Sequence, residues 1–316
     1  MQDQPVSAAK NISIPSADAD RLAVTVLTPA YNRADGLSAL WESLCAQTSK
    51  NFSWLIIDDG STDDTKSAVL GFIEKSDFDI EYIKKENGGK HTALNLAISC
   101  VKTPLSFIVD SDDTLTPDAI ETIEKSYEEF GENSDICGFS FLRAYRDGRI
   151  NGKPFPKDFW VESYINARIN SNDMNSDKAE VYKTECLREF PFPEFSGERF
   201  LGEDVVWIRM ARKYKTVHIN SAIYIGEYQS DGLTKNRRIH NMNSPNGCVA
   251  RASEYLYSDI CLKMRIKGYL QYLVYGRVAG RRYGNLIKDV PSKIIFLLLI
   301  LPAFLIRVRW QRQIKN

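Results

Sequence analysis

The feature that most limits the possible folds is a regular alternation of short apolar runs and amphipathic segments in the first part of the chain. Runs rich in β-branched and aromatic residues predict strands at residues 23–28, 53–59, 79–85 and 105–110. The segments between and after them have apolar residues at helical spacing and predict helices from about residues 37, 62, 90 and 116, the last opened by Pro117. Four strand–helix units in succession favour an α/β fold with a parallel, doubly wound sheet.

The alternation of strands and helices breaks down after about residue 145. Residues 146–160 and 190–197 are rich in Pro, Gly and Phe, and this predicts long loops over the sheet. One further helix is expected at 203–214 and one further strand at 217–228. Because ligands of such sheets bind at the carboxyl ends of the strands, we expect the functional site there.

Composition places the chain among globular proteins, with 43% hydrophobic and 26% charged residues. Its six cysteines form no CxxC pair and have no histidine at ligand spacing, which argues against a disulfide framework and a zinc site. Reduced cysteines of this kind are typical of a cytoplasmic protein. Residues 1–20 form a polar leader that lacks the apolar core of a signal peptide.

Three carboxylates directly follow the fourth expected strand, in the segment FIVDSDDTLTP at residues 107–117. Asp110, Asp112 and Asp113 would repel one another unless a cation lies among them. A divalent ion with oxygen ligands, Mn²⁺ or Mg²⁺, relieves such repulsion and also binds phosphate oxygens. The segment therefore predicts a metal ion that carries a diphosphate. The competing interpretation is that Asp113 caps the following helix.

Ligand-type residues follow the other three expected strands as well. The first ends in TPAYNR, and the second ends in Asp58 and Asp59, whose carboxylates can accept hydrogen bonds from a nucleobase or from ribose hydroxyls. The third unit contains NGGK, in which two glycines allow close backbone approach and Lys90 offers a charge suited to phosphate at a helix N-terminus. Each motif alone has a simple turn interpretation, but four consecutive strands that end this way indicate a nucleotide site.

Taken together, these motifs resemble the ordered signature of the family 2 glycosyltransferases of the GT-A fold. The resemblance covers residues 22–230 and rests on VTVLTPAYNRADGL, LIIDDGSTDDT, NGGKHTALN, FIVDSDDTLTP and the later Gly202-Glu203-Asp204. It implies a Rossmann-like, mostly parallel sheet at residues 21–240. It also implies an inverting, metal-dependent transfer of a sugar from a nucleotide-sugar, usually a UDP-sugar, to an acceptor hydroxyl.

The resemblance also implies roles for individual residues. Asp204 would be the catalytic base, and Asp110 and Asp112 would bind the metal ion. The residues expected around the nucleotide and its diphosphate are Thr28, Pro29, Tyr31, Arg33, Asp59, Lys90 and Asp110, with Asp58 the weaker candidate of its pair. Among the acids crowded there, the pKa of Asp204 would be raised. Arg237 or Arg238 could reach phosphate, and the absence of the QxxRW pattern of processive synthases favours transfer of one sugar at a time.

Aromatic side chains offer a further set of candidates for contacts with the acceptor sugar. Phe159, Trp160, Tyr164 and Trp207 could stack on a sugar ring, although aromatic residues in such positions more often belong to the core.

The C-terminal extension, residues 241–316, differs in character from the rest. From Lys263 onward twelve basic residues face a single acid, Asp289, and residues 294–306 are uninterrupted apolar sequence. A helix of these thirteen residues reaches about 20 Å, which is too short to span a bilayer core of about 30 Å. We expect it to lie on or enter an anionic membrane surface at the inner face of the cell membrane. The alternatives are a buried helix of the domain and, more remotely, a nucleic-acid stripe, and we expect no nucleic-acid partner.

The leading functional hypothesis is therefore a glycosyltransferase that acts on a lipid-linked glycan in bacterial surface-polysaccharide biosynthesis. The alternatives are a nucleotidyltransferase that activates sugars and a non-catalytic membrane protein that binds sugar nucleotides. A nucleotidyltransferase would need a glycine-rich phosphate loop after the first strand, and TPAYNRADG is not one. A dinucleotide-binding oxidoreductase is excluded because no G-x-G-x-x-G follows any expected strand.

Overall fold

The computed structural model describes residues 11–13, 23–174, 176–226 and 237–315. Its centre is one ten-stranded sheet with the strand order β1-β4-β3-β2-β5-β9-β7-β10-β6, and β8 pairs with β10. The strands are β1 (Asn11–Ser13), β2 (Val24–Ala30), β3 (Phe52–Asp58), β4 (Asp79–Lys84), β5 (Leu105–Ile108), β6 (Thr114–Leu115), β7 (Ile136–Ala144), β8 (Trp160–Glu162), β9 (Lys178–Lys183) and β10 (Lys215–Ile225).

The direction of the strands confirms the predicted α/β class with a mostly parallel sheet. Strands β4, β3, β2 and β5 pair in parallel, and β7 pairs in parallel with β10. Strand β9 lies antiparallel between β5 and β7. The parallel group β4-β3-β2-β5 and the parallel pair β7-β10 therefore run in the same direction. The short strands β1, β6 and β8 pair antiparallel at the margins.

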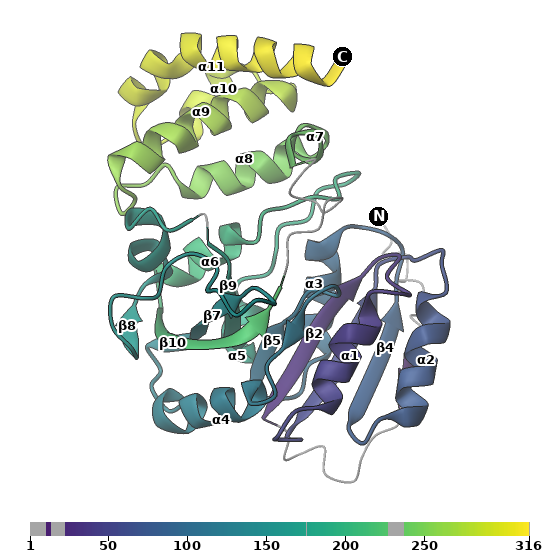
Figure 1. Ribbon diagram of the computed structural model, residues 1–316. Helices are drawn as coiled ribbons and strands as arrows, with labels where there is room; N and C mark the ends of the chain where they lie inside the picture. The colour runs from purple at the N-terminus through teal and green to yellow at the C-terminus, as the bar shows by residue number, and fades with distance from the viewer. Residues whose placement is uncertain (1–10, 14–22, 175, 227–236, 316) are drawn as a thin grey trace.

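Helices cover both faces of the sheet (Figure 1). They are α1 (Leu37–Cys45), α2 (Thr65–Lys75), α3 (Lys90–Cys100), α4 (Ala119–Phe130), the π-helix η2 (Ile165–Asn170), α5 (Thr184–Glu189), α6 (Asp204–Ala211), α7 (Arg237–Asn243), α8 (Pro245–Glu254), α9 (Leu262–Val278), α10 (Tyr283–Leu286), the 3₁₀ helix η3 (Ile287–Asp289) and α11 (Lys293–Lys315).

Alternate residues of each central strand enter different hydrophobic cores, because successive side chains point to opposite faces. Trp54 and Ile56 of β3 pack in the core that contains α1, α2 and α4. Leu55 and Ile57 pack in the second core, with α3, α5 and α6. Burial on both faces explains why these strands read as continuous apolar runs in the sequence.

Several elements differ from the sequence prediction. Strands β7, β8 and β9 and the helices η2 and α5 were not predicted. Strand β7 precedes the two segments expected to be loops, 146–160 and 190–197, and the other elements lie almost entirely between them. Asp118 is the N-cap residue of α4, so Pro117 precedes this helix and does not open it. Part of the expected leader, Asn11–Ser13, forms the edge strand β1. All six cysteines are free, as predicted.

The C-terminal helices α8, α9 and α11 form a layer beside the sheet (Figure 1). The expected boundary between residues 240 and 241 falls inside α7. One face of α11 packs in a third core, where Phe296 and Ala303 are buried. The opposite face exposes a row of apolar side chains, Ile294, Leu297, Leu298, Leu301, Phe304 and Leu305.

Helix α11 is longer than the apolar run that predicted it. It has 23 residues, so it extends about 34 Å at 1.5 Å per residue. Lys293–Gln313 has a hydropathy of 1.9 and is long and apolar enough to cross a membrane. The expected helix length of thirteen residues was therefore wrong, because the helix continues through the basic residues that follow the apolar run. The expectation that the segment does not span a membrane stays a prediction.

Candidate active site

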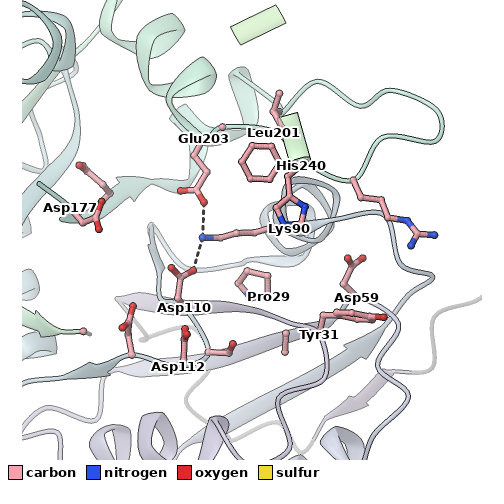
Figure 2. A pocket seen from close by; sticks show the side chains of 18 of the residues that line it. Pro29, Tyr31, Asp59, Lys90, Asp110, Asp112, Asp177, Leu201, Glu203 and His240 are labelled. Carbon is pink, nitrogen blue, oxygen red and sulfur yellow. Dashed lines mark hydrogen bonds and ion pairs between the residues drawn. The ribbon is translucent and has the colours of Figure 1, made fainter. Parts of the chain in front are cut away.

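A pocket of about 820 Å³ opens at the carboxyl ends of β2, β3 and β5, where the sequence predicts the site. Residues that follow these strands form one wall, and they include Tyr31, Asp59 and Asp110. The opposite wall includes Tyr164, Arg168, Asp177, Lys178 and Glu180 from η2 and β9. The segment from Gly197 to Glu203 closes a third side. Figure 2 shows carboxylates from several of these segments turned toward a common space.

A lysine between two carboxylates lies at the centre of the pocket (Figure 2). Nζ of Lys90, at the start of α3, is 2.5 Å from Oδ1 of Asp110 and 2.6 Å from Oε1 of Glu203. Burial lowers the pKa of Lys90, but the two carboxylates outweigh burial and raise it. Burial raises the pKa of Asp110, but Lys90, together with Arg143 and Arg33, outweighs burial and lowers that pKa. In the free protein, Lys90 is thus the positive partner of the first carboxylate of the acidic segment.

The third carboxylate of that segment has a partner of its own. Oδ2 of Asp113 accepts hydrogen bonds from Nη2 of Arg143 and from the Tyr224 hydroxyl, both at 2.7 Å. The Tyr224 oxygen in turn accepts the backbone N–H of Asp110 at 2.9 Å. Burial raises the pKa of Asp113 to about 6 against the opposing effect of Arg143. Asp113 therefore braces the acidic turn against β7 and β10, and it does not cap α4.

Asp112 is the carboxylate that remains for a cation. It lines the pocket and makes no hydrogen bond or ion pair with the residues that the structure describes. Within that same part of the chain, no group of three or more His, Cys, Asp or Glu residues could hold a metal ion. Mg²⁺ and Mn²⁺ commonly use one or two carboxylates together with phosphate oxygens and water. Asp110 and Asp112, both facing the pocket, fit that mode of binding.

Asp59 holds the glycine-rich turn that leads into α3. Its carboxylate accepts hydrogen bonds from the N–H groups of Gly88 (2.9 Å) and Gly89 (2.7 Å) and from Nζ of Lys85 (2.8 Å). Gly89 has a φ of +94°, and a Cβ there would lie 2.0 Å from the carbonyl oxygen of Arg199. This glycine is thus required for packing against the 197–203 segment. Asp58 is fully buried, binds the Ser61 N–H at 2.6 Å and does not line the pocket.

The end of β2 supplies three of its four predicted pocket residues. Pro29, Tyr31 and Arg33 line the pocket, Tyr31 is 48% exposed, and Nε of Arg33 donates to the Ser111 hydroxyl at 3.2 Å. The prediction for Thr28 was wrong. Its side chain is fully buried and its hydroxyl accepts a hydrogen bond from Nε1 of Trp54 at 2.9 Å, because Thr28 lies on the core-facing side of the strand.

The two acids at the start of α6 point in different directions. Glu203 enters the pocket, whereas Asp204 is not among the lining residues. The Asp204 carboxylate accepts bonds from Nε (2.5 Å) and Nη2 (2.7 Å) of Arg251 and from the Tyr255 hydroxyl (2.5 Å). Burial raises its pKa, but Arg251 and the hydrogen bond from Tyr255 together outweigh burial and lower it. The expectation of a raised pKa was therefore wrong, and catalysis by Asp204 stays a prediction.

Most of the second wall was not found from the sequence. Arg143, Arg168, Asp177, Lys178 and Glu180 come from β7, η2 and β9, or lie directly beside them, and the sequence pattern did not predict these elements. Of the four aromatic candidates, Tyr164 and Trp207 line the pocket. Arg237 and Arg238 lie in α7 and do not line it, and the preceding part of the 229–238 loop lies outside the described residues.

Comparison with solved structures defines the class of fold. Residues that cover 92% of the chain superpose on 90% of S. aureus TarS 1–349 in complex with UDP-GlcNAc, with a TM-score of 0.64 and 18% identity. The mannosyltransferase PcManGT from Pyrobaculum calidifontis, in complex with GDP-Man and Mn²⁺, gives a TM-score of 0.55 at 17% identity over 90% of this chain and 80% of that one. The architecture is therefore that of the GT-A glycosyltransferases.

The family follows from the sequence itself. Residues 25–183, half of the chain, match the model of glycosyl transferase family 2, and the chain belongs to that family. The glycosyltransferase GlyA of Streptococcus pneumoniae serotype 4 is 35% identical over 225 residues, which are 67% of this chain and 31% of that protein. The chain spans less than a third of the length of this and of other curated glycosyltransferases that it matches.

Proposed function

We propose that this glycosyltransferase moves one sugar from a UDP-sugar to a hydroxyl group of a lipid-linked glycan, with inversion, in the assembly of a surface polysaccharide. The observation that carries the proposal is Lys90 held between Asp110 and Glu203 at the carboxyl edge of the sheet. Through Lys90, the predicted metal ligand Asp110 and the pocket carboxylate Glu203 form one charged cluster. The nucleotide-sugars bound by TarS and PcManGT support the donor class.

The reaction requires one displacement at the anomeric carbon. The acceptor oxygen forms a bond to that carbon while the bond from the carbon to the diphosphate oxygen breaks. The nucleoside diphosphate leaves with the electron pair, and the proton of the acceptor hydroxyl passes to a carboxylate. A general base must lie within hydrogen-bond reach of that proton, either directly or through a water molecule.

Beside Asp204, the residue that the family motif implies as the base, we consider Glu203 as a second candidate for the proton acceptor. Its side chain is 31% exposed and lies in the pocket, whereas the Asp204 carboxylate is 11% exposed and already accepts three hydrogen bonds. Lys90 orients the Glu203 carboxylate through their ion pair. Catalysis by Asp204 stays the expectation from the sequence, and substitution of each acid by its amide decides between them.

The donor fits the wall built from β2, β3 and α3. Tyr31 offers a ring for the base, Pro29 and Arg33 line the same wall, and the Asp59 carboxylate lies beside them. Lys90 would face the diphosphate. Asp110 and Asp112 would hold Mn²⁺ or Mg²⁺, and such an ion, when bound, neutralises the charge of the departing diphosphate. The Mn²⁺ in the PcManGT complex supports this choice of ion.

Helix α11 supports a location at the inner face of the cell membrane. Its exposed apolar row includes Ile294, Leu297, Leu298, Leu301 and Leu305, and the basic side chains of Lys293, Arg309 and Arg312 lie near its ends. An apolar face flanked by cations binds anionic bilayers, with about 1 kcal/mol from each basic residue near the surface. A lipid-linked acceptor would be presented at that surface.

Vesicle flotation tests this location. The wild-type chain should float with anionic vesicles. A variant with Leu297, Leu298 and Leu301 changed to Ser should not float, because it lacks much of the exposed apolar row. These side chains are exposed, so the substitutions leave the packing of α11 on α9 intact. Equal flotation of both proteins would contradict membrane binding through α11.

Calorimetry with UDP, with and without Mn²⁺, tests the proposed site. We expect Mn²⁺-dependent binding to the full chain and loss of the Mn²⁺ dependence in Asp112→Ala, which removes a pocket carboxylate without breaking an ion pair. The matched control is Asp118→Ala, which removes an exposed carboxylate outside the pocket. An affinity for UDP that is the same without Mn²⁺ and in Asp112→Ala would refute the metal site. Absence of UDP binding would refute the proposed donor.

A further inference from the structure

The pocket contains a buried amide that has no part in the reaction described above. Asn151 lies shortly after β7 and lines the pocket, although only 7% of the residue is exposed. Its side-chain amide makes no hydrogen bond with the residues that the structure describes, and it is open to the pocket. Because buried polar groups are nearly always hydrogen-bonded, an amide in this state indicates that a ligand supplies the partner.

The backbone on both sides of Asn151 is held in place. The Asn151 N–H donates to the carbonyl oxygen of Arg143, at the end of β7, at 2.8 Å. The next residue, Gly152, has a φ of +84°, and a Cβ there would lie 2.1 Å from Cβ of Ser176. Only glycine permits this approach of the two segments. The Asn151 amide is therefore presented to the pocket from a fixed backbone, which lowers the entropy cost of binding a ligand.

The neighbours of Asn151 place it near the expected sugar of the donor. Arg143, whose carbonyl group it contacts, binds Asp113 of the acidic turn, residues 110–113. Ser176, which packs on Gly152, precedes Asp177, and the Asp177 carboxylate faces the pocket (Figure 2). In Figure 2 the acidic turn lies between the nucleotide wall and Asp177. A sugar joined to a diphosphate at the acidic turn would thus extend toward Asn151 and Asp177.

We propose that Asn151 is a specificity-determining residue that hydrogen-bonds the hydroxyl groups of an uncharged hexose on the donor. This inference rests on the proposed function and narrows its class of donor. An amide donates and accepts hydrogen bonds at once, as a sugar hydroxyl does, and Asp177 offers a further acceptor. A sugar that lacks the matching hydroxyl leaves the buried amide unpaired and is rejected. A sugar carboxylate would be repelled by Asp177 and by the acidic turn, which excludes uronic acids.

A second asparagine of the same region provides a structural control. The amide of Asn220 in β10 accepts the Phe155 N–H at 2.7 Å and donates to the Phe155 carbonyl oxygen at 3.1 Å, and Asn220 does not line the pocket. In urea unfolding, Asn220→Ala should lower the midpoint because both bonds are lost. Asn151→Ala should keep the wild-type midpoint, because its amide stabilises no other part of the fold. An equal fall in both variants would overturn the proposal.

Calorimetry in the presence of Mn²⁺ tests the contact itself, with UDP, UDP-glucose and UDP-N-acetylglucosamine as probes. In Asn151→Ala the Kd for UDP should stay within twofold of the wild-type value. The Kd for the UDP-hexose that the wild type prefers should rise about fivefold, because one hydrogen bond is lost. Asn220→Ala should change the Kd for UDP and for that UDP-hexose by the same factor. The same factor for both probes in Asn151→Ala would overturn the proposal.

A charged donor tests the class of sugar. UDP-glucuronic acid should bind the wild type at least tenfold more weakly than UDP-glucose, from which it differs by a carboxylate. Asp177→Asn removes the charge that faces the pocket and should narrow this difference. Binding of UDP-glucuronic acid as tight as that of UDP-glucose would overturn the assignment of an uncharged hexose.

These measurements separate this inference from the proposed function. Absence of binding of UDP and of both UDP-hexoses by the wild type would reject the UDP-sugar donor. GDP and GDP-mannose, the donor in the PcManGT complex, then provide the same comparison for Asn151→Ala, and absence of their binding would reject both proposals. Normal binding of UDP and of a UDP-hexose, with an equal response of both to Asn151→Ala, would reject the role of Asn151 alone.

Discussion

The two walls of the pocket are built in different ways. The wall that faces the proposed nucleotide consists of residues that lie at or just beyond the ends of parallel strands, such as Tyr31 and Asp59. The opposite wall is assembled from η2, β9 and β7, and its position depends on the insertion of β9 antiparallel between β5 and β7. The first wall is a local consequence of the strand–helix units, whereas the second exists only after distant segments have paired. We expect the first to bind the donor nucleotide and the second to recognise what differs among glycosyltransferases, the sugar and the acceptor.

The largest effect that separates the two walls is expected at Asp177. Its exposed carboxylate lines the second wall and faces the pocket in Figure 2. A hydrogen bond to a charged group contributes about 1.5–3 kcal/mol, so Asp177→Ala should lower kcat/KM about 10- to 100-fold. Steady-state kinetics with UDP-sugars, together with calorimetry of UDP, would show a Kd for UDP within twofold of the wild type. A comparable loss of UDP affinity would contradict the division of roles.

The first wall could be predicted because its signals are contiguous in the sequence. Asp59, Lys90, Asp110 and Asp112 each follow a recognisable strand, and the parallel sheet brings their positions together. Thr28 was misplaced because side chains alternate along a strand, so a shift of one residue exchanges the core face for the other face. Its neighbour Pro29 does line the pocket.

The second and third sides of the pocket could not be predicted, each for its own physical reason. The partners of β9 are β5 and β7, and pairing across such separations has no local sequence signal. At the start of α6, the adjacent acids Glu203 and Asp204 diverge by about 100° around the helix axis. The sequence does not say which of the two faces the pocket, because that depends on how Arg251 of α8 docks.

A smaller, complementary effect is expected on the first wall. Tyr31 is half exposed at the pocket, and stacking of an aromatic ring on a base contributes about 1–3 kcal/mol. Tyr31→Ala should weaken UDP binding at least fivefold in calorimetry, while kcat at saturating donor changes less than twofold. Tyr31→Phe keeps the ring and serves as the matched control. A fall in kcat with unchanged UDP affinity would place the nucleotide elsewhere in the pocket.

The smallest effect at neutral pH is expected on the free energy of unfolding, and it concerns the layer of side chains behind the second wall. His218 of β10 is fully buried beside the rings of Phe155 and Trp160, with centroid distances of 4.8 and 5.5 Å. Burial lowers its pKa to about 4 from 6.5. The unfolded chain therefore binds the proton more tightly, so the stability that neutral His218 provides is present above pH 6.5 and is lost as the pH falls toward 4.

Urea unfolding of the wild type and of His218→Phe at pH 7 and pH 5 measures this loss. The Phe variant keeps a buried ring but cannot be protonated. The difference between the two proteins therefore removes the contribution of the other groups that titrate in this range. Between the two pH values the wild type should lose about 2 kcal/mol more of its free energy of unfolding than the variant. The corresponding layer behind the nucleotide wall contains the fully buried Trp54 and Ile56, which do not titrate. The same pH dependence in both proteins would mean that His218 is already solvated in the folded state, and the second wall would then be more open to water than its packing indicates.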